Sequence, residues 1–286
     1  MKLFAKGMEI AAQSPNSKEI VCTHSILCQV GLPRKRIVER EFLRRSGDAW
    51  INVQAGTLDE GRGPVCQPVP YGPIPRLVLA WVSTYALRMK TREVPIGQSA
   101  AAFLREMGMG DDGKRYHSLR QQMHALAACR FQLGFKGRTF NGQPIEQFDA
   151  WLTTDGPQRP LWPGILVLSE SYFRTLEDGA VPLDARALLE LKGSSLALDV
   201  YVWLAQRLHR VAARGEFVRW KPLREQFAQE YTGKYAARDF RTAFLLALRD
   251  VLVVYPKARV RVAKLGLSLG SSPPPVPPRS FHSILP

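Results

Sequence analysis

Cysteine is scarce in this sequence, and no stretch of it is apolar enough to cross a membrane. The 286 residues include only four cysteines, which are scattered rather than clustered. Secreted domains stabilised by disulfides carry a denser cysteine framework, so we expect a protein of the reducing cytoplasm. No apolar run approaches the roughly 20 residues that span a bilayer, and the first residues lack the apolar core of a secretory signal. These absences predict a cytoplasmic protein without a membrane partner.

Catalytic and metal-binding patterns are missing as well. Cys22, His24 and Cys28 form the densest group of metal-binding side chains, but the cysteine spacing is wider than in structural zinc sites. Asp184 and the run 190–192 lie too close together, within one expected helix, to form the carboxylate pair of a nuclease. There is no glycine-rich loop of the kind that binds ATP, and the five scattered histidines form no Ser-His-Asp arrangement. We therefore expect no enzyme activity, no cofactor and no bound metal.

Acidic residues are the scarcer charged class, and this imbalance points to a polyanionic partner. The chain has 40 Lys and Arg against 25 Asp and Glu, a formal net charge of +15. Such a field attracts phosphate polyanions over a long range. The hydrophobic fraction of 45% and the length predict a globular protein of two compact domains. Charge alone does not distinguish a nucleic-acid binder from an ordinary basic protein, so local patterns must decide.

One pattern of expected elements occurs twice along the chain. The first copy begins with an amphipathic helix around Trp81 and a short extended segment at 93–96. A short helix ending at Met107 follows, then a turn, a basic helix over 114–128 and an alternating strand over 130–135. This is the order of elements in a winged helix-turn-helix, in which a β-hairpin follows the recognition helix.

The same order recurs in the second copy. Trp203 takes the place of Trp81, and the long helix around it is followed by an extended segment and a short helix. A basic helix over 238–250 and a returning hairpin over 258–269 complete the copy. Two such copies on a basic chain predict a protein that binds double-stranded DNA.

The predicted fold class is α+β and helix-rich. We expect two tandem winged helix-turn-helix domains with small antiparallel β-ribbons and a basic N-terminal extension. The expected parts are an extension with short strands (1–70), the first winged-helix domain (71–178), the second (179–269) and an extended Pro-rich tail (270–286).

Each basic helix is expected to lie in a major groove, with exposed side chains facing base edges. The alternative is an ordinary amphipathic helix with a solvated charged face. The candidate DNA-binding residues of the first copy are Lys114, Arg115, His117, Arg120, Gln121 and His124 on the helix and Lys136 and Arg138 on the expected wing. Those of the second copy are Lys234, Arg238, Arg241, Arg249, Arg259 and Arg261.

A further basic run lies near the N-terminus. Arg34, Lys35 and Arg36 are candidates for an arm that contacts the DNA backbone. The alternative is a solvated strand pair, because Glu39 and Glu41 are interleaved with the basic residues.

Several segments, taken in their order, resemble the plasmid-encoded RepA family of replication initiators. They are 32–36, 70–77, 80–81, 180–188, 196–204, 223–227, 238–241, 255–256 and 272–277. The resemblance implies binding at a plasmid origin and recruitment of host replication proteins such as a helicase or an initiator, in the bacterial cytoplasm beside the nucleoid. Repeats as the origin sites, melting of an AT-rich segment, and repression of the chain's own promoter with control of copy number follow only by analogy of fold.

Two functions share this DNA-binding fold. A replication initiator is expected to bind directly repeated sites beside an AT-rich stretch, whereas a plasmid-encoded transcriptional repressor is expected to bind one palindrome over a promoter. Because the two basic helices differ in sequence, we expect one chain to cover a non-palindromic site of about two helical turns. The sequence leaves self-association open.

Overall fold

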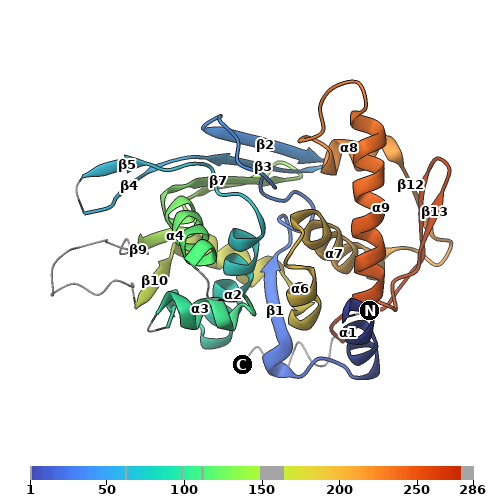
Figure 1. Ribbon diagram of the computed structural model, residues 1–286, viewed down its shortest axis with the longest axis horizontal. Coiled ribbons are helices and arrows are strands. Elements are labelled where there is room, and N and C mark those ends of the chain that lie inside the picture. The colour runs from blue at the N-terminus through green and yellow to red at the C-terminus, as the bar shows by residue number, and fades with distance from the viewer. Residues whose placement is uncertain (1, 62, 98, 111–112, 149–163, 278–286) are drawn as a thin grey trace.

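Two runs of helices and strands with the same order of elements lie side by side in the structure (Figure 1). The computed structural model describes residues 2–61, 63–97, 99–110, 113–148 and 164–277. The first run, here the first repeat, consists of α2 (Pro73–Met89), β6 (Glu93–Pro95), α3 (Ala100–Glu106), α4 (Gly113–Ala128), β9 (Ile145–Phe148) and β10 (Ile165–Leu168). The second run, the second repeat, consists of α7 (Ser195–Arg207), β12 (Glu216–Arg219), α8 (Trp220–Phe227), α9 (Ala236–Val254), β13 (Val260–Ala263) and β14 (Gly266–Leu269). Both predicted basic helices are present, and each follows a short helix and a turn.

The repeats share a sheet topology and an aromatic contact. In each repeat three strands form an antiparallel sheet in which the first strand pairs with the last, in the orders β6-β10-β9 and β12-β14-β13. The rings of Trp81 and Phe103 meet edge to face with centroids 5.0 Å apart, and Trp203 meets Phe227 in the same way at 5.5 Å. An equivalent contact thus joins the first two helices of each repeat. The internal repetition predicted from the sequence is confirmed.

The hairpin after α4 belongs to a different sheet from the one predicted. β7 (Arg130–Phe135) and β8 (Arg138–Gly142) pair with each other, but β7 also pairs with β3 (Ala49–Gln54), which pairs with β2 (Glu41–Ser46). These strands form a four-stranded sheet across the top of Figure 1. The strands in the wing position are β9 and β10, and most of the segment between them, 149–163, lies outside the described residues. The prediction of a wing at 136–142 is therefore wrong, because an alternating strand fits either sheet equally well.

The first 70 residues are interleaved with the rest of the chain rather than appended to it. The expected short strands are present, but β1 (Ile20–His24) pairs with β11 (Ala180–Asp184), and β2 and β3 supply half of the four-stranded sheet. α1 (Lys2–Ala12), which the sequence did not predict, packs along α9. A Cβ atom added at Gly7 would lie 2.4 Å from the carbonyl oxygen of Val253, so only glycine permits this close approach. This segment is a structural part of the protein and not a separate extension.

The Pro-rich segment after β14 folds back onto the protein as far as residue 277. The N–H of Ser272 donates to the carbonyl of Leu208 (3.2 Å), and the hydroxyl of Tyr255 donates to the carbonyl of Pro273 (2.7 Å). Val276 packs against Ile20, and both side chains are almost fully buried. Residues 270–277 are thus a strap and not the extended tail predicted, while 278–286 lie outside the described residues.

A continuous hydrophobic core joins the two repeats. In α9, Phe240, Phe244, Leu248 and Val251 recur at intervals of three and four residues and are buried, which leaves the opposite stripe of the helix to solvent. The remaining elements are η1 (Ser17–Glu19), β4 (Thr57–Asp59), β5 (Pro64–Cys66), α5 (Glu170–Gly179), α6 (Ala185–Leu191) and η2 (Leu208–Arg210). Among the helices of the described residues, none has the length and apolar character needed to cross a membrane.

His24 on β1 predicts an acid-sensitive stability. Its side chain is 4% exposed and stacks on the Tyr172 ring, and burial lowers its pKa to about 4. Between pH 6.5 and 4 the unfolded chain binds a proton that the folded protein does not. The free energy of unfolding therefore decreases by up to about 3 kcal/mol as the pH is lowered through this range. Urea unfolding from pH 7.5 to 4.5 should show a shallower decline in His24→Asn, which keeps an acceptor near Nδ1. Equal declines in both proteins would contradict this assignment.

Candidate nucleic-acid interface

The exposed N-terminal half of α9 carries arginines that lie on aromatic rings. The guanidinium of Arg241 lies over the Trp220 ring at 5.0 Å, and that of Arg238 over the Tyr235 ring at 4.5 Å. Arg238 also contacts the neighbouring Asp239 (3.1 Å) in an exposed pair that solvent screens. A ring orients a cation without neutralising it, so these charges stay available to a phosphate or a base edge.

Trp220, the first residue of α8, also holds the hairpin turn between β13 and β14. Its backbone N–H donates to the carbonyl of Leu265 (3.1 Å), and its indole N–H donates to the carbonyl of Lys264 (3.2 Å). Arg219 and Lys221 on either side of Trp220 are exposed. The start of α8, the hairpin tip and the N-terminal half of α9 therefore lie close together. We define the second-repeat basic surface as Arg219, Lys221, Lys234, Arg238, Arg241 and Lys264.

Three members of this surface were missed from the sequence. Arg219, Lys221 and Lys264 stand alone in sequence, in a strand end, a helix start and a turn, so no local pattern marks them. Only their place in the order of elements could have identified them as candidates. In a winged helix-turn-helix, the start of the second helix and the hairpin turn both flank the recognition helix.

The exposed part of α4 is also its N-terminal half. Lys114, Arg115 and His117 are exposed, as predicted for residues that face a partner. Gln121 is only partly exposed, and its side-chain oxygen accepts a hydrogen bond from the Tyr71 hydroxyl (3.1 Å). In a recognition helix the N-terminal residues reach furthest into the groove, and the exposed half of α4 is this N-terminal half.

His124 points into the protein and is not a DNA contact. Its side chain is 3% exposed, and Nδ1 lies 3.3 Å from a carboxylate oxygen of Glu60. Burial lowers the pKa of His124 against the opposing effect of Glu60, so the ring is neutral at pH 7. The same carboxylate lies 3.7 Å from Arg120, whose side chain remains 23% exposed. Glu60 therefore covers Arg120 and His124 in the middle of α4, so the polar face predicted for this helix is not exposed along its whole length.

Arg34 is buried as well, which corrects its assignment to a DNA-backbone arm. Its side chain is 7% exposed and forms ion pairs with Asp199 (3.3 Å) and Glu230. Lys35 and Arg36 are exposed in the segment before β2. The basic run thus combines one structural arginine with two surface cations.

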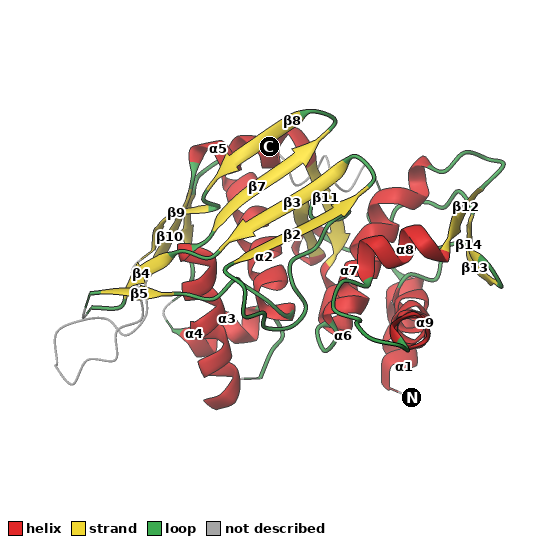
Figure 2. Cartoon of the chain, turned by 90° about the horizontal axis from the view of Figure 1, so that it is seen from above, coloured by secondary structure: helices red, strands yellow, loops and turns green. Residues whose placement is uncertain are grey.

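The other predicted contacts are dispersed. Lys136 and Arg138 belong to the β7–β8 hairpin, whose turn lies at the upper edge of Figure 2, whereas α4 and α9 both lie toward its lower edge. Arg249 is exposed in the C-terminal half of α9 and forms an ion pair with the next residue (2.8 Å). Arg259, just before β13, and Arg261, within β13, are both exposed. The structure brings Lys234, Arg238 and Arg241 together and places Lys136, Arg138 and Arg249 away from them.

The chemistry of this interface is that of cations and aromatic rings. In the described ranges, no three His, Cys, Asp or Glu side chains gather as metal ligands. Burial raises the pKa of the Cys22 thiol to about 12, so it stays protonated at neutral pH. The two basic helices offer charge, hydrogen-bond donors and stacking surfaces, which are the groups that bind nucleic acids.

A sequence profile described as plasmid-encoded RepA protein matches residues 69–221, just over half of the 286 residues. The chain belongs to this family. The matched region begins just before α2 and ends in the first turn of α8, so it covers the first repeat and the start of the second. The family resemblance stated from the sequence is confirmed.

Crystal structures of domains 2 and 3 of RctB are similar to this chain. One superposes with a TM-score of 0.52 at 15% identity, covering 86% of this chain and 98% of that chain. A second has a TM-score of 0.46 at 15% identity, covering 84% and 85%. No curated protein sequence matches the chain. The first likeness extends over both repeats and shows the α+β fold.

The second-repeat basic surface generates a direct prediction. Arg241→Ala and Arg238→Ala should each weaken specific DNA binding by about 1–3 kcal/mol, because each removes a cation that its ring holds toward the partner. The matched control is Arg174→Ala on α5, an arginine of similar exposure (73%) that should change affinity less than about twofold. Fluorescence anisotropy with specific and shuffled duplexes measures both. An equal loss on the two duplexes would assign these arginines to phosphate contacts, and no loss would remove them from the interface.

Proposed function

We propose that this protein initiates plasmid replication by binding double-stranded DNA at the plasmid origin through two winged-helix units, one in each repeat. Membership of the plasmid-encoded RepA family supports the replication role. The observation that carries the proposal is the second-repeat basic surface, in which the start of α8, the turn before β14 and the N-terminal half of α9 present cations together.

The geometry of this surface suits a duplex. A recognition helix enters the major groove with its N-terminal residues toward the base edges, and Arg238 and Arg241 occupy that part of α9. Lys264 on the hairpin turn and Lys221 at the start of α8 adjoin Trp220, whose ring lies under Arg241, and these exposed lysines would contact phosphates beside the groove. Lys114, Arg115 and His117 occupy the corresponding part of α4.

The proposal extends to partners and location. The protein acts as a binding protein rather than an enzyme, without a cofactor, in the bacterial cytoplasm on its own plasmid. Its DNA targets are repeats at the origin, and it recruits host replication proteins such as a helicase or an initiator. Family membership is the support for recruitment.

An origin-dependent maintenance assay tests the function. A reporter plasmid that carries only the origin should persist in dividing cells when this protein is supplied from a second replicon, and should be lost with Arg241→Ala. Arg174→Ala should support the plasmid as the wild type does. Loss of the reporter with all three proteins, together with tight binding to a palindrome in the protein's own promoter, would favour a transcriptional repressor instead.

Salt dependence tests the physical basis of binding. With several phosphates contacted by lysines and arginines, log affinity should fall linearly with log salt with a slope of magnitude about 5 to 10. Anisotropy titrations between 50 and 300 mM KCl on the origin fragment provide the slope. A slope near zero would show that phosphate contacts do not dominate and would count against the whole interface.

A further inference from the structure

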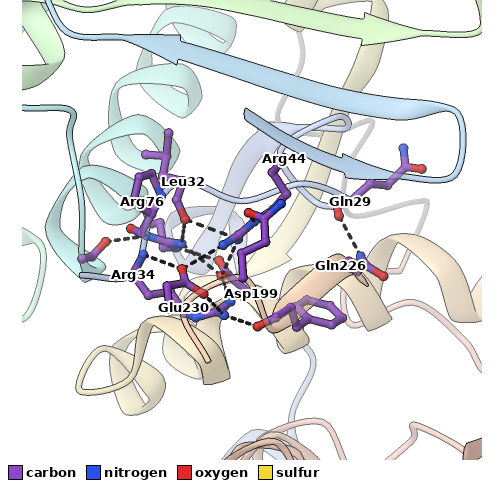
Figure 3. Close-up of polar contacts among 12 residues, drawn as sticks. Gln29, Leu32, Arg34, Arg44, Arg76, Asp199, Gln226 and Glu230 are labelled. Atoms are coloured by element: carbon purple, nitrogen blue, oxygen red, sulfur yellow. Dashed lines mark hydrogen bonds and ion pairs between the residues drawn. The ribbon is translucent and has the colours of Figure 1, made fainter. Parts of the chain in front are cut away.

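A buried cluster of five charged side chains joins the two repeats (Figure 3). At its centre is Asp199 in the second turn of α7, which accepts two hydrogen bonds from Arg76 in the first turn of α2. The Arg76 Nε lies 2.6 Å from Oδ1 and its Nη2 lies 3.0 Å from Oδ2. Arg76 and Asp199 take nearly equivalent places in the first helices of their repeats, about one turn before Trp81 and Trp203. A two-pronged ion pair thus links the first helices of the two repeats.

Two more arginines bring the N-terminal segment and the turn before α9 into the same cluster. Arg34 lies 3.3 Å from Asp199, and its backbone N–H donates to Glu230 (3.2 Å). Arg44 on β2 donates to Glu230 (2.8 Å) and to the side-chain oxygen of Gln229 (3.1 Å). Glu230 and Gln229 belong to the turn between α8 and α9. The cluster thus holds the segment that leads directly into the basic helix of the second repeat.

The cluster is buried and carries an excess of positive charge. Its three arginines face two carboxylates, and the side chains of Arg44 and Asp199 are 1% and 5% exposed. Burial raises the pKa of Asp199, but Arg76, Arg34 and Arg44 outweigh burial and hold that pKa below its usual value. Burial, and then repulsion from Arg34, lowers the pKa of Arg44 to about 10, so it remains charged at neutral pH. Asp199 and Arg44 are therefore both ionised at neutral pH.

Such a cluster fixes the orientation of the elements that it joins more than it adds to the stability of the fold. A buried ion pair gains little over well-packed apolar side chains of the same size, because desolvation offsets most of the attraction. Beside the ion pair, a cavity of about 40 Å³ lies between α2 and α7 and is lined mainly by apolar side chains, among them Leu77, Ala80, Leu198 and Val202. Apolar packing resists separation but has little directional preference. The hydrogen-bonded ion pairs are directional, so they fix the angle at which the repeats meet.

We propose that Asp199 and Glu230 are positioning residues that hold the two repeats at one separation and orientation, so that the protein binds two half-sites only at one spacing. This inference rests on the proposed function, because its readout is DNA binding. It adds which residues determine the half-site spacing that the protein accepts. Both carboxylates pair with the buried arginines, so we assign neither of them a contact with DNA. They act through the placement of α9 relative to α4.

A panel of duplexes with altered half-site separation tests the proposal. Inserting five base pairs rotates one half-site by about half a helical turn, and should lower wild-type affinity at least about 30-fold. In Asp199→Asn and Glu230→Gln the same insertion should cost less than about fivefold, because flexibly joined domains tolerate a change of spacing. Glu230, at the rim with 12% side-chain exposure, provides the milder variant if Asp199→Asn does not fold.

Two further variants separate geometry from stability. Gly31→Ala keeps all five charges, but its Cβ atom would lie 2.7 Å from the Asp199 carboxylate, so it should relax the spacing preference without removing an ion pair. Val94→Ala truncates a fully buried side chain on β6, away from the cluster, and should lower the melting temperature while keeping the full 30-fold preference. A folded Asp199→Asn or Glu230→Gln protein with the wild-type preference would overturn the proposal.

A measurement without DNA makes the outcome independent of the proposed function. Spin labels on His117→Cys and Thr242→Cys, in a Cys66→Ser background, report the distance between α4 and α9. The wild-type background should give one narrow distance distribution, and adding Asp199→Asn or Glu230→Gln should broaden it. Unchanged distributions in both variants would refute the positioning role. Broadening, together with no binding of origin DNA by the unlabelled wild-type protein, would keep the positioning role and refute the proposed function.

Discussion

The ion pair between Asp199 and Arg76 is the contact on which the rest of the structure depends. A buried carboxylate requires positive partners, and each buried arginine that meets it requires further acceptors. Those acceptors are the carbonyls of Leu32, Pro33 and Gly72 and the side chain of Glu230. The need to satisfy these groups draws the N-terminal segment, β2, both first helices and the turn before α9 to one place. This requirement explains why the first 70 residues are built into the protein instead of preceding it.

The two candidate surfaces, on α4 and on α9, obtain their charge in different ways. In the second repeat, Trp220 links three elements, since its ring lies under Arg241 and its two N–H groups hold the hairpin turn. In the first repeat, Glu60 covers the middle of α4 and leaves only the N-terminal half exposed. One surface therefore offers cations on aromatic rings, and the other a short stretch of Lys114, Arg115 and His117. Two unlike surfaces in a fixed relation suit a DNA site without two-fold symmetry.

Local patterns were enough to predict the repeat. The periodic burial of α9, the short strands and the Trp81–Trp203 correspondence all depend on residues close together in sequence. The structure confirms the predicted order of elements in each copy as far as the basic helix. The failures involve contacts between distant residues. The alternation in β7 predicts a strand but not its pairing with β3, some 80 positions earlier, so the wing was misplaced. Arg34 stands in an ordinary basic run, and its partner Asp199 lies in α7, 165 positions later. His124 was placed on the reading face because Glu60, which covers it, follows no periodic pattern.

The central claim is that one chain reads one DNA site with both repeats held in a fixed relation. Hydroxyl-radical footprinting on the plasmid origin, with the stoichiometry of the complex determined on the same samples, tests this claim most directly. The account predicts that a single chain protects two segments on one face of the duplex, within about two helical turns and without two-fold symmetry. A palindromic footprint made by two chains, each touching DNA with one repeat alone, would contradict it.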